Sequence, residues 1–273
     1  MPDTDLYAFN CADSTLNHSY VVQMLTAEMG EEVNDPTRKI PFYLVDHPDG
    51  TIIFDTGVSY DLISDPENYG PYGEAGLAAV VDDFPMDEGQ QPVHQLTDAG
   101  YPPEEIDYVV MSHLHIDHAG NIDQLPDAEF LVQQDELAYA WWPSAPVQKA
   151  YYLEGDIAPL RDPDIAVTEL AGEYDLFGDG SVVCIPTPGH SPGHQSLLVR
   201  SENAGTIVLA GDVAGTHVAY EQEIFHPYTW NTERAAASAR ALRQRAVAED
   251  PDVVILHDAA DFESLPTLPG AYR

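Results

Sequence analysis

Residues 108–121 read YVVMSHLHIDHAGN, and two features of this segment recur along the chain. The apolar run YVVM is typical of a buried strand. Directly after it stand four residues of metal-ligand type within six positions, His113, His115, Asp117 and His118. Side chains two residues apart in an extended segment point the same way, so His113 and His115 can bind one ion. Asp117 and His118 then turn away and can reach a second ion.

Three further apolar runs end in the same way. CIPTPGH ends at His190, TIVLAGD ends at Asp212, and VVILH ends at His257. Strands hold the groups at their ends rigidly, and the loops that follow can converge from distant parts of the chain. One histidine alone is usually a surface or core residue, whereas this repeated pattern indicates a single site. Neutral imidazole and carboxylate suit zinc or a similar first-row divalent ion.

The other apolar runs predict the secondary structure around this site. Two helices are predicted, Asp135–Trp142 and Thr232–Glu249, and Asn231 or Thr232 can cap the second. Residues 60–92 are rich in Gly, Pro, Asp and Tyr and form a long excursion. The predicted strands are Leu6–Phe9, Ser19–Thr26, Ile40–Asp46, Thr51–Asp55, the YVVM run at 108–111, Glu129–Gln133, Ser181–Pro186, Ser196–Arg200, Thr206–Ala210 and Asp252–Leu256.

Both halves of the chain are rich in strands and also contain helices. This order predicts an α+β protein with a two-sheet core covered by helices on both sides. No repeat, low-complexity tract or linker interrupts the pattern, so residues 1–273 are expected to form a single domain. Hydrophobic residues make up 44% of the chain, which is enough for a sizeable core.

The charge balance is extreme, with 47 acidic and 10 basic residues and a formal net charge of −37. Such a surface repels nucleic acid and anionic membranes, so neither is expected as a partner. We interpret the acidic surface as an adaptation to high salt and expect a halophilic protein. No apolar run approaches the roughly 18 residues of a membrane span. The acidic amino terminus does not resemble a secretory signal, so a cytoplasmic location is expected.

Several other residues have a role that the sequence leaves open. Asp55 in IIFDTG is either a turn residue before Gly57 or an acceptor that orients a metal-bound histidine. His194 stands four residues after His190 and is expected to orient the loop rather than to bind metal. Cys11 and Cys184 are expected to be buried, reduced thiols. The remaining histidines are expected to be structural or surface residues: His18, His47, His94, His217 and His226.

The segment HLHIDHAG resembles the HxHxDH signature of the metallo-β-lactamase superfamily. More closely, the chain is similar to the N-acyl homoserine lactone lactonases. This similarity runs nearly end to end, through IIFDTG, SHLHIDHAGN, TPGHSPGHQSLLV, AGD and ILHD. The resemblance implies a four-layer αββα sandwich, the metallo-β-lactamase fold, with the site on one edge.

The resemblance also implies a ligand assignment and a reaction. His113, His115 and His190 would hold one metal, Asp117, His118 and His257 the other, and Asp212 would bridge the two. The implied activity is opening of the lactone ring of N-acyl homoserine lactones, which quenches quorum sensing. Zinc is the first expectation for both metals, with iron, cobalt and manganese as alternatives. Asp117 would be both a ligand and the catalytic proton shuttle to the leaving alkoxide.

One position departs from the family pattern. Many of these lactonases carry a tyrosine three residues after the bridging aspartate, where it contacts the substrate carbonyl, and this chain has Gly215 there. Tyr220 and Tyr228 are the two candidates to replace it, and the sequence assigns no substrate-binding residue. Candidate walls for an acyl chain, or for a homodimer contact, are Tyr60, Tyr69, Tyr72, Phe84, Trp141, Trp142, Tyr151 and Tyr152.

Two other functions stay open on the sequence alone. The first is a hydrolase of the same fold that acts on different lactones, thioesters or esters. The second is a metal-binding protein without catalysis. The set of seven ligand-type residues argues against the second, and the strongly acidic surface argues against a nucleic-acid-processing member of the fold.

Overall fold

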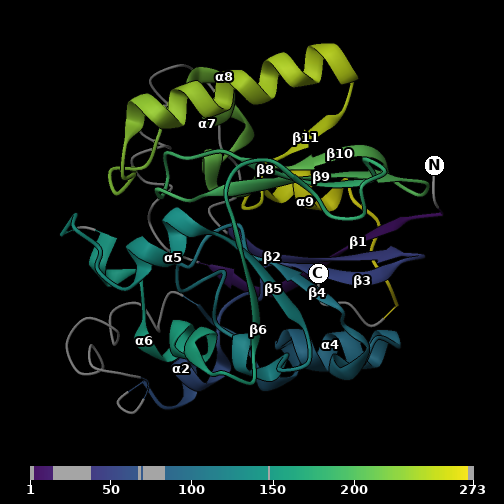
Figure 1. Ribbon diagram of the computed structural model, residues 1–273, viewed down its shortest axis with the longest axis vertical. Coiled ribbons are helices and arrows are strands. Elements are labelled where there is room, and N and C mark those ends of the chain that lie inside the picture. The colour runs from purple at the N-terminus through teal and green to yellow at the C-terminus, as the bar shows by residue number, and fades with distance from the viewer. Residues whose placement is uncertain (1–2, 15–37, 67–68, 70–83, 147, 270–273) are drawn as a thin grey trace.

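Two stacked β-sheets with helices on both outer faces make up the protein in the computed structural model (Figure 1). The structure describes residues 3–14, 38–66, 69, 84–146 and 148–269. The helices α7 and α8, His217–Gln222 and Thr232–Glu249, cover one outer face, and α2 and α4, Tyr60–Ser64 and Pro92–Ala99, cover the other. The predicted α+β fold with four αββα layers is therefore confirmed.

The first sheet holds the strands β1 to β6 in sequence order. The first three are antiparallel to one another, and β3, β4, β5 and β6 run parallel. The register pairs His47 with Gly50, so Pro48 and Asp49 form a hairpin turn between β2 and β3. The strands are β1 Asp5–Ser14, β2 Arg38–His47, β3 Gly50–Phe54, β4 Tyr108–Val110, β5 Glu129–Gln133 and β6 Ala166–Leu170.

The second sheet has the order β11-β10-β9-β8-β7. Its pairs are antiparallel except for β10 and β11, which run parallel. The strands β8, β10 and β11 consequently share one direction, and their carboxyl ends lie at the same edge. The bounds are β7 Tyr174–Asp175, β8 Val182–Pro186, β9 Gln195–Ser201, β10 Gly205–Leu209 and β11 Asp252–Val254.

Shorter helices connect and flank the sheets. The remaining α-helices are α5 Gln134–Ala140, α6 Glu154–Ile157 and α9 Ala259–Glu263. Single 3₁₀ turns are η1 Glu88–Gln90, η2 Pro103–Glu105, η3 Ile122–Gln124, η4 Gln148–Ala150, η5 Ala158–Arg161 and η6 Gly211–Val213.

Alternation along the strands divides the core into three apolar layers. On β9, Leu197 and Val199 pack between the sheets, and Leu198 faces the layer under α8. On β2, Phe42 faces the helices below the first sheet and Tyr43 faces the second sheet. Strand side chains alternate with a period of two, so one strand contributes to two layers of the core.

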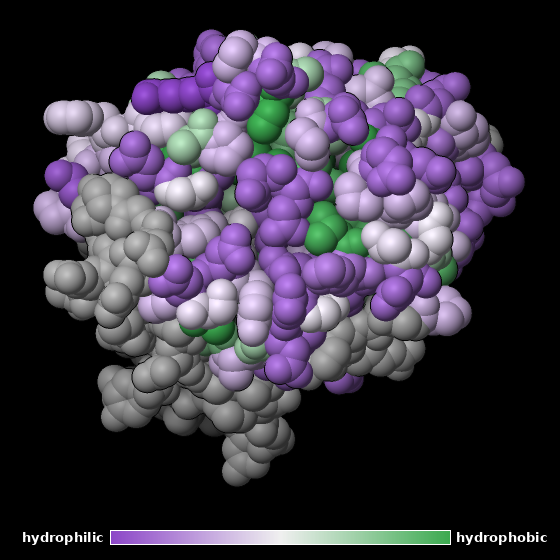
Figure 2. Space-filling model, turned by 90° about the horizontal axis from the view of Figure 1, so that it is seen from below, coloured by the Kyte–Doolittle hydropathy of each residue, from purple (hydrophilic) through white to green (hydrophobic). Residues whose placement is uncertain are grey.

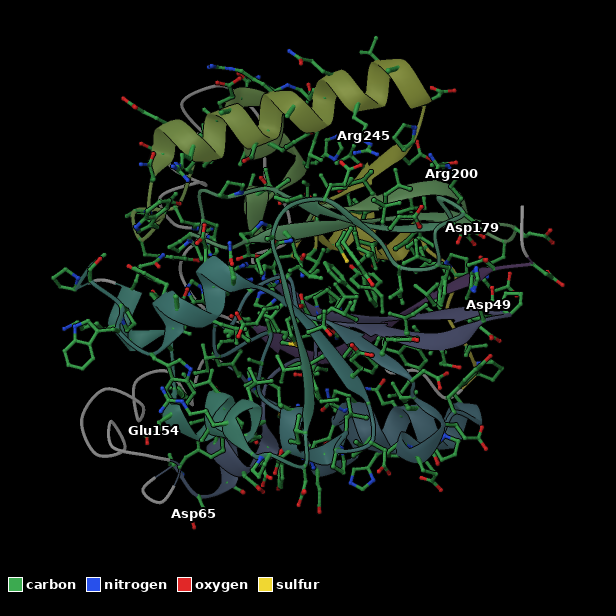
Figure 3. The ribbon with its side chains drawn as sticks, viewed as in Figure 1. Asp49, Asp65, Glu154, Asp179, Arg200 and Arg245 are labelled. Atoms are coloured by element: carbon green, nitrogen blue, oxygen red, sulfur yellow. The ribbon has the colours of Figure 1, made fainter. Side chains whose placement is uncertain are left out.

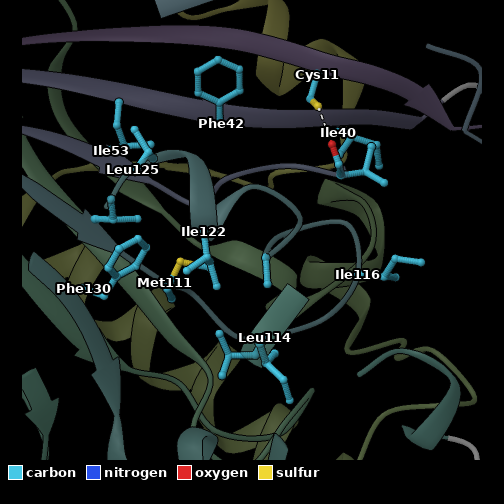
Figure 4. Close-up of a cluster of buried hydrophobic side chains, with 14 of the residues drawn as sticks. Cys11, Ile40, Phe42, Ile53, Met111, Leu114, Ile116, Ile122, Leu125 and Phe130 are labelled. Carbon is cyan, nitrogen blue, oxygen red and sulfur yellow. Dashed lines mark hydrogen bonds between the residues drawn. The ribbon is translucent and has the colours of Figure 1, made fainter. Parts of the chain in front are cut away.

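The layer below the first sheet brings together segments that are distant in the sequence (Figure 4). Phe42, Ile53, Met111 and Phe130 come from four strands or their ends and are fully buried there. Cys11 lies at the edge of this layer, and its thiol donates to the carbonyl oxygen of Val58 at 3.4 Å. Burial raises the pKa of the Cys11 thiol to about 12.

Most predicted elements agree with the structure within a few residues. The helix Thr232–Glu249 and the strand Glu129–Gln133 have the predicted bounds, and the Asn231 side chain caps the helix by accepting from the backbone N–H of Arg234. Both cysteines are buried and free, as predicted. The predicted strand Ser19–Thr26, together with His18 and Tyr72, lies outside the described residues. The excursion at 60–92 contains α2 and the start of α4, short helices that owe their stability to packing rather than to propensity.

Acidic side chains dominate the surface. The face shown in Figure 2 is mostly hydrophilic, with small apolar areas between polar ones. Asp49, Asp65, Glu154 and Asp179 lie at the periphery and point away from the core (Figure 3). Among the described helices, none combines the length and the apolarity required to span a bilayer.

We expect Leu197→Ala to lower the free energy of unfolding by about 2–5 kcal/mol, because it opens a cavity between the two sheets. Leu197 is fully buried. Val247→Ala is the control, since Val247 is 90% exposed, and its effect should stay within about 0.5 kcal/mol. Urea denaturation in concentrated salt measures both. Equal effects for the two variants would contradict the described packing.

Candidate metal centre

The seven predicted ligand-type residues meet at one edge of the two sheets. His113, His115, Asp117 and His118 lie in the loop after β4. The other three come from the second sheet: His190 after β8, Asp212 in η6 after β10, and His257 after β11. All four segments therefore follow the carboxyl ends of their strands.

The side chains form three overlapping groups, each with its ligand atoms within 4.8 Å of one another. The first contains His113, His115 and His190, and the second contains Asp117, His118 and His257. The third joins them through Asp212, which lies with His113 and His118. The structure thus brings together every residue that the sequence singles out as a candidate ligand.

Asp212 lies between the first two groups. Its Oδ2 is 3.4 Å from Nε2 of His190, and its Oδ1 is 3.0 Å from Nε2 of His257. Oδ1 also lies 3.6 Å from Nε2 of His118. One carboxylate thus offers one oxygen to each group.

The ring nitrogens of the first group are arranged to share a bound cation. Nε2 of His113 is buried and has no hydrogen-bond partner among the described residues, and Nδ1 of His115 lies 3.0 Å from Nε2 of His190. Buried polar atoms are nearly always hydrogen-bonded, and each one left without a partner destabilises a fold by about 1–3 kcal/mol. A metal ion is a partner that imidazole nitrogens facing one another can share.

The electrostatics favour neutral imidazoles in the first group. Burial lowers the pKa of His115 to about 3 and places that of His113 well below its ordinary value. His118 differs: burial lowers its pKa, but the carboxylates of Asp117 and Asp55 outweigh burial and raise it to about 9. Metal binding needs deprotonated imidazole, so a cation would replace a proton at His118.

Asp55 holds His118 and the loop after β4. Its Oδ2 accepts from Nδ1 of His118 at 2.8 Å, which leaves Nε2 of that ring facing the other ligands. Its Oδ1 accepts from the backbone N–H of Ser112 at 2.6 Å, and Oδ2 also accepts from the Ser112 hydroxyl. Asp55 has a φ of 62°, a strained value for a residue with a side chain. Asp55 therefore bonds to a candidate ligand, and its role in orienting a metal-bound histidine stays a prediction.

His194 and His257 are fixed by backbone groups. His194 accepts the backbone N–H of Asp212 at Nε2 and contacts Thr187 through Nδ1, so it positions the loop that carries Asp212. Nδ1 of His257 lies 2.6 Å from the carbonyl oxygen of Lys39 on β2. Because one nitrogen of each ring is bonded to the backbone, the direction of the other nitrogen is fixed.

Glu136 is a functional residue that the sequence analysis missed. This fully buried carboxylate joins the two loops that carry the first group of ligands. Its Oε1 accepts from the backbone N–H of Leu114 at 3.0 Å and from the Tyr152 hydroxyl. Its Oε2 accepts from the Ser191 hydroxyl and from the backbone N–H of Gly193. Glu136 stands in a predicted helix, where a glutamate is ordinary, so no local signal in the sequence identifies it.

The structure places Tyr228, and not Tyr220, beside the site. The Tyr228 ring lies 5.6 Å from the His190 ring and 4.7 Å from the Tyr151 ring, measured between centroids. Tyr220 is buried in the layer under α8. At Gly215 a Cβ would lie 2.2 Å from Nε2 of His226, so a larger residue there would require His226 to move.

The candidate aromatic walls divide into two sets. Tyr151 and Tyr152 lie against His115, with ring centroids at 5.4 and 4.7 Å. Phe84 is part of the core, and Trp142 is 86% exposed, so neither faces the ligands. Among the histidines expected to be structural or surface residues, His94 is exposed, whereas His226 is buried and stacks on Tyr228.

Comparison with known proteins identifies the family. A model described as the metallo-beta-lactamase superfamily matches residues 37–256. The match covers most of the chain, so the protein belongs to the metallo-β-lactamase superfamily, as the HxHxDH segment indicated.

Within that superfamily the chain is similar to proteins named N-acyl homoserine lactonase. It is 35% identical to N-acyl homoserine lactonase AttM of Rhizobium radiobacter over 231 residues, 83% of this chain and 86% of the relative. It is 29% identical to the N-acyl homoserine lactonase of Bacillus thuringiensis over 266 residues, 97% of each protein. The resemblance noted in the sequence is confirmed.

A solved structure shares this architecture along nearly its whole length. It is an N-acyl homoserine lactone hydrolase with the product N-hexanoyl-L-homoserine bound at its catalytic metal centre. The TM-score is 0.77 at 26% sequence identity, and the match covers 98% of both chains.

We expect Glu136→Gln to weaken metal binding by about 10- to 100-fold, the usual effect of losing a group that orients ligands. The amide nitrogen of glutamine cannot accept a hydrogen bond, so the bonds to one of the two ligand loops are lost. Competition with a chelator measures the affinity. Asp135→Asn, on the exposed side of the same helix, is the control, and identical affinities in the two variants would show that Glu136 does not position the ligands.

Proposed function

We propose that this protein is a dinuclear metal-dependent hydrolase that opens the lactone ring of N-acyl homoserine lactones. The observation that carries the proposal is the position of Asp212, with one oxygen toward each of two complete ligand groups. Similarity to lactonases along nearly the whole chain supports this substrate class.

The proposed ligands follow from the three groups. His113, His115 and His190 would hold one ion, and Asp117, His118 and His257 would hold the other, with Asp212 shared. When bound, two divalent ions supply Lewis acidity and lower the pKa of water towards neutrality. The imidazole and carboxylate donors suit zinc, and iron, cobalt and manganese are the alternatives for the same donor set.

Asp117 is the proposed proton carrier. Hydrolysis adds water across the acyl C–O bond of the ring, and the ring oxygen that leaves must gain a proton. The Asp117 side chain is 13% exposed, whereas those of His118 and Asp212 are 1% and 4% exposed. A carboxylate at the open side of the site can hold a proton and pass it to the leaving oxygen, which gives the N-acyl homoserine.

The proposed activity predicts about two divalent ions per chain and ring opening of N-acyl homoserine lactones. Metal content is measured on protein purified in concentrated salt, and turnover is followed as proton release from a panel of lactones. Chelation should abolish turnover and zinc should restore it, because the donors are then occupied again.

A matched panel of thioesters and phosphoesters is the control. Turnover of those substrates alone would assign the protein to another hydrolase activity of the same fold. Bound metal with no turnover of any substrate would contradict catalysis.

We further propose that the protein works in the cytoplasm of a halophile. The support is the net charge of −37, carried largely by exposed carboxylates. The Debye length falls from about 10 Å at 0.1 M salt to about 3 Å at 1 M salt, so concentrated salt removes most of the repulsion between surface charges.

This adaptation predicts that the melting temperature rises steeply between about 0.1 M and about 1 M salt. Circular dichroism melts in sodium chloride measure the effect. Sucrose at the same osmolality is the control, because it leaves the charges unscreened and should not replace salt. Full structure and activity at low ionic strength would overturn the interpretation.

A further inference from the structure

Arg38 is a buried cation beside the metal centre that the ligand assignment leaves without a role. It is the first residue of β2 and only 6% exposed. The next residue, Lys39, offers its carbonyl oxygen to His257, so the start of this strand lies against the site. Arginine is almost never buried to this extent unless it is paired.

Two nitrogens of the guanidinium are available to donate hydrogen bonds. Its Nε and Nη2 are buried and have no hydrogen-bond partner within the part of the chain that the structure describes. Burial lowers the pKa of Arg38, but interactions with Tyr228, Asp212 and Asp117 outweigh burial and raise it. The side chain is therefore charged, and the groups that stabilise its charge are Tyr228 and two proposed ligands.

In the metal-loaded enzyme, those two carboxylates would no longer neutralise the charge of Arg38. Asp212 and Asp117 lie within the ligand groups, so bound cations would neutralise their charge. A buried guanidinium next to two divalent ions then requires an anion from outside the protein. The fork of N–H groups on arginine matches a carboxylate in geometry as well as in charge.

Arg38 interacts with Tyr228, which is itself packed against His226. The two rings stack with centroids 4.8 Å apart, and His226 fills the space above Gly215. The Tyr228 ring also contacts Tyr151 and His190, and its hydroxyl interacts with Arg38. Arg38 is therefore linked through Tyr228 to the ring of a proposed ligand.

Resting on the proposed lactonase activity, the geometry points to Arg38 as an anion-recognition residue for the carboxylate formed when the ring opens. Its two unpartnered nitrogens would bind that carboxylate, and they would meet the same carbonyl oxygen as negative charge develops there during hydrolysis. Arg38 is then a specificity-determining residue that favours ligands with a carboxyl group at the metal end.

The test measures binding of the ring-opened acid N-hexanoyl-homoserine to zinc-loaded protein by isothermal titration calorimetry. Arg38→Gln should weaken binding by about 10- to 100-fold, the value of a charge-assisted hydrogen bond. Arg38→Lys keeps the charge but loses the two parallel N–H donors, so its affinity for the acid should lie between those of Arg38→Gln and the wild type. The primary amide of the same acid has no charge, so its affinity should change little.

Arg240→Gln is the matched control, because it removes an equal charge from an exposed residue that pairs with Glu223. Metal content and melting temperature are measured for every variant. Unchanged affinity for the acid in Arg38→Gln overturns the proposal. So does a loss of metal with normal affinity in the loaded fraction, which would make Arg38 a structural counter-ion.

The two proposals fail in different ways. A wild-type protein that opens no lactone refutes the proposed activity, and the calorimetry still reports on Arg38. Acid binding that depends on Arg38 would then support the anion site alone. Absence of any acid binding to the loaded wild type overturns it.

Discussion

Five imidazoles and two carboxylates lie together in one largely buried cluster, and the rest of the structure is arranged around that constraint. Desolvated polar groups of this density are unfavourable by themselves, because their nitrogens face one another instead of hydrogen-bond donors. Bound cations would reverse the balance, so we expect folding and metal binding to be coupled. Packing the two sheets face to face brings their strand ends together at one edge, and each strand end places one or a few ligand groups there with little freedom.

Buried polar groups outside the ligand set hydrogen-bond to the ligands and orient them. Asp55 bonds to the far nitrogen of His118, a backbone carbonyl bonds to His257, and His194 accepts the N–H of Asp212. Glu136 ties together the two loops that come from different sheets. Each of these groups is satisfied within the protein, so the directions of the ligands are set before any metal arrives.

The sequence predicts the ligands better than it predicts their supports. His113 and Asp212 follow apolar runs whose period and composition identify strands, and the spacing of histidines is itself informative. Glu136 and Arg38 give no such local signal, because a glutamate in a helix and an arginine at a strand start are ordinary. Only the tertiary structure shows that both are buried. Whether Tyr220 or Tyr228 lies beside the site likewise depends on packing that no local pattern encodes.

The surface and the site act on opposite length scales. A net charge of −37 repels an anionic product at long range and leaves a neutral lactone unaffected. In concentrated salt that field is screened within about 3 Å, so it contributes little to choosing a ligand. Recognition must then come from contacts that salt does not reach, such as a guanidinium buried beside metal ions. A protein with a strongly acidic surface can therefore bind an anionic product. The buried guanidinium selects the ligand, and the surface carboxylates keep the protein dispersed.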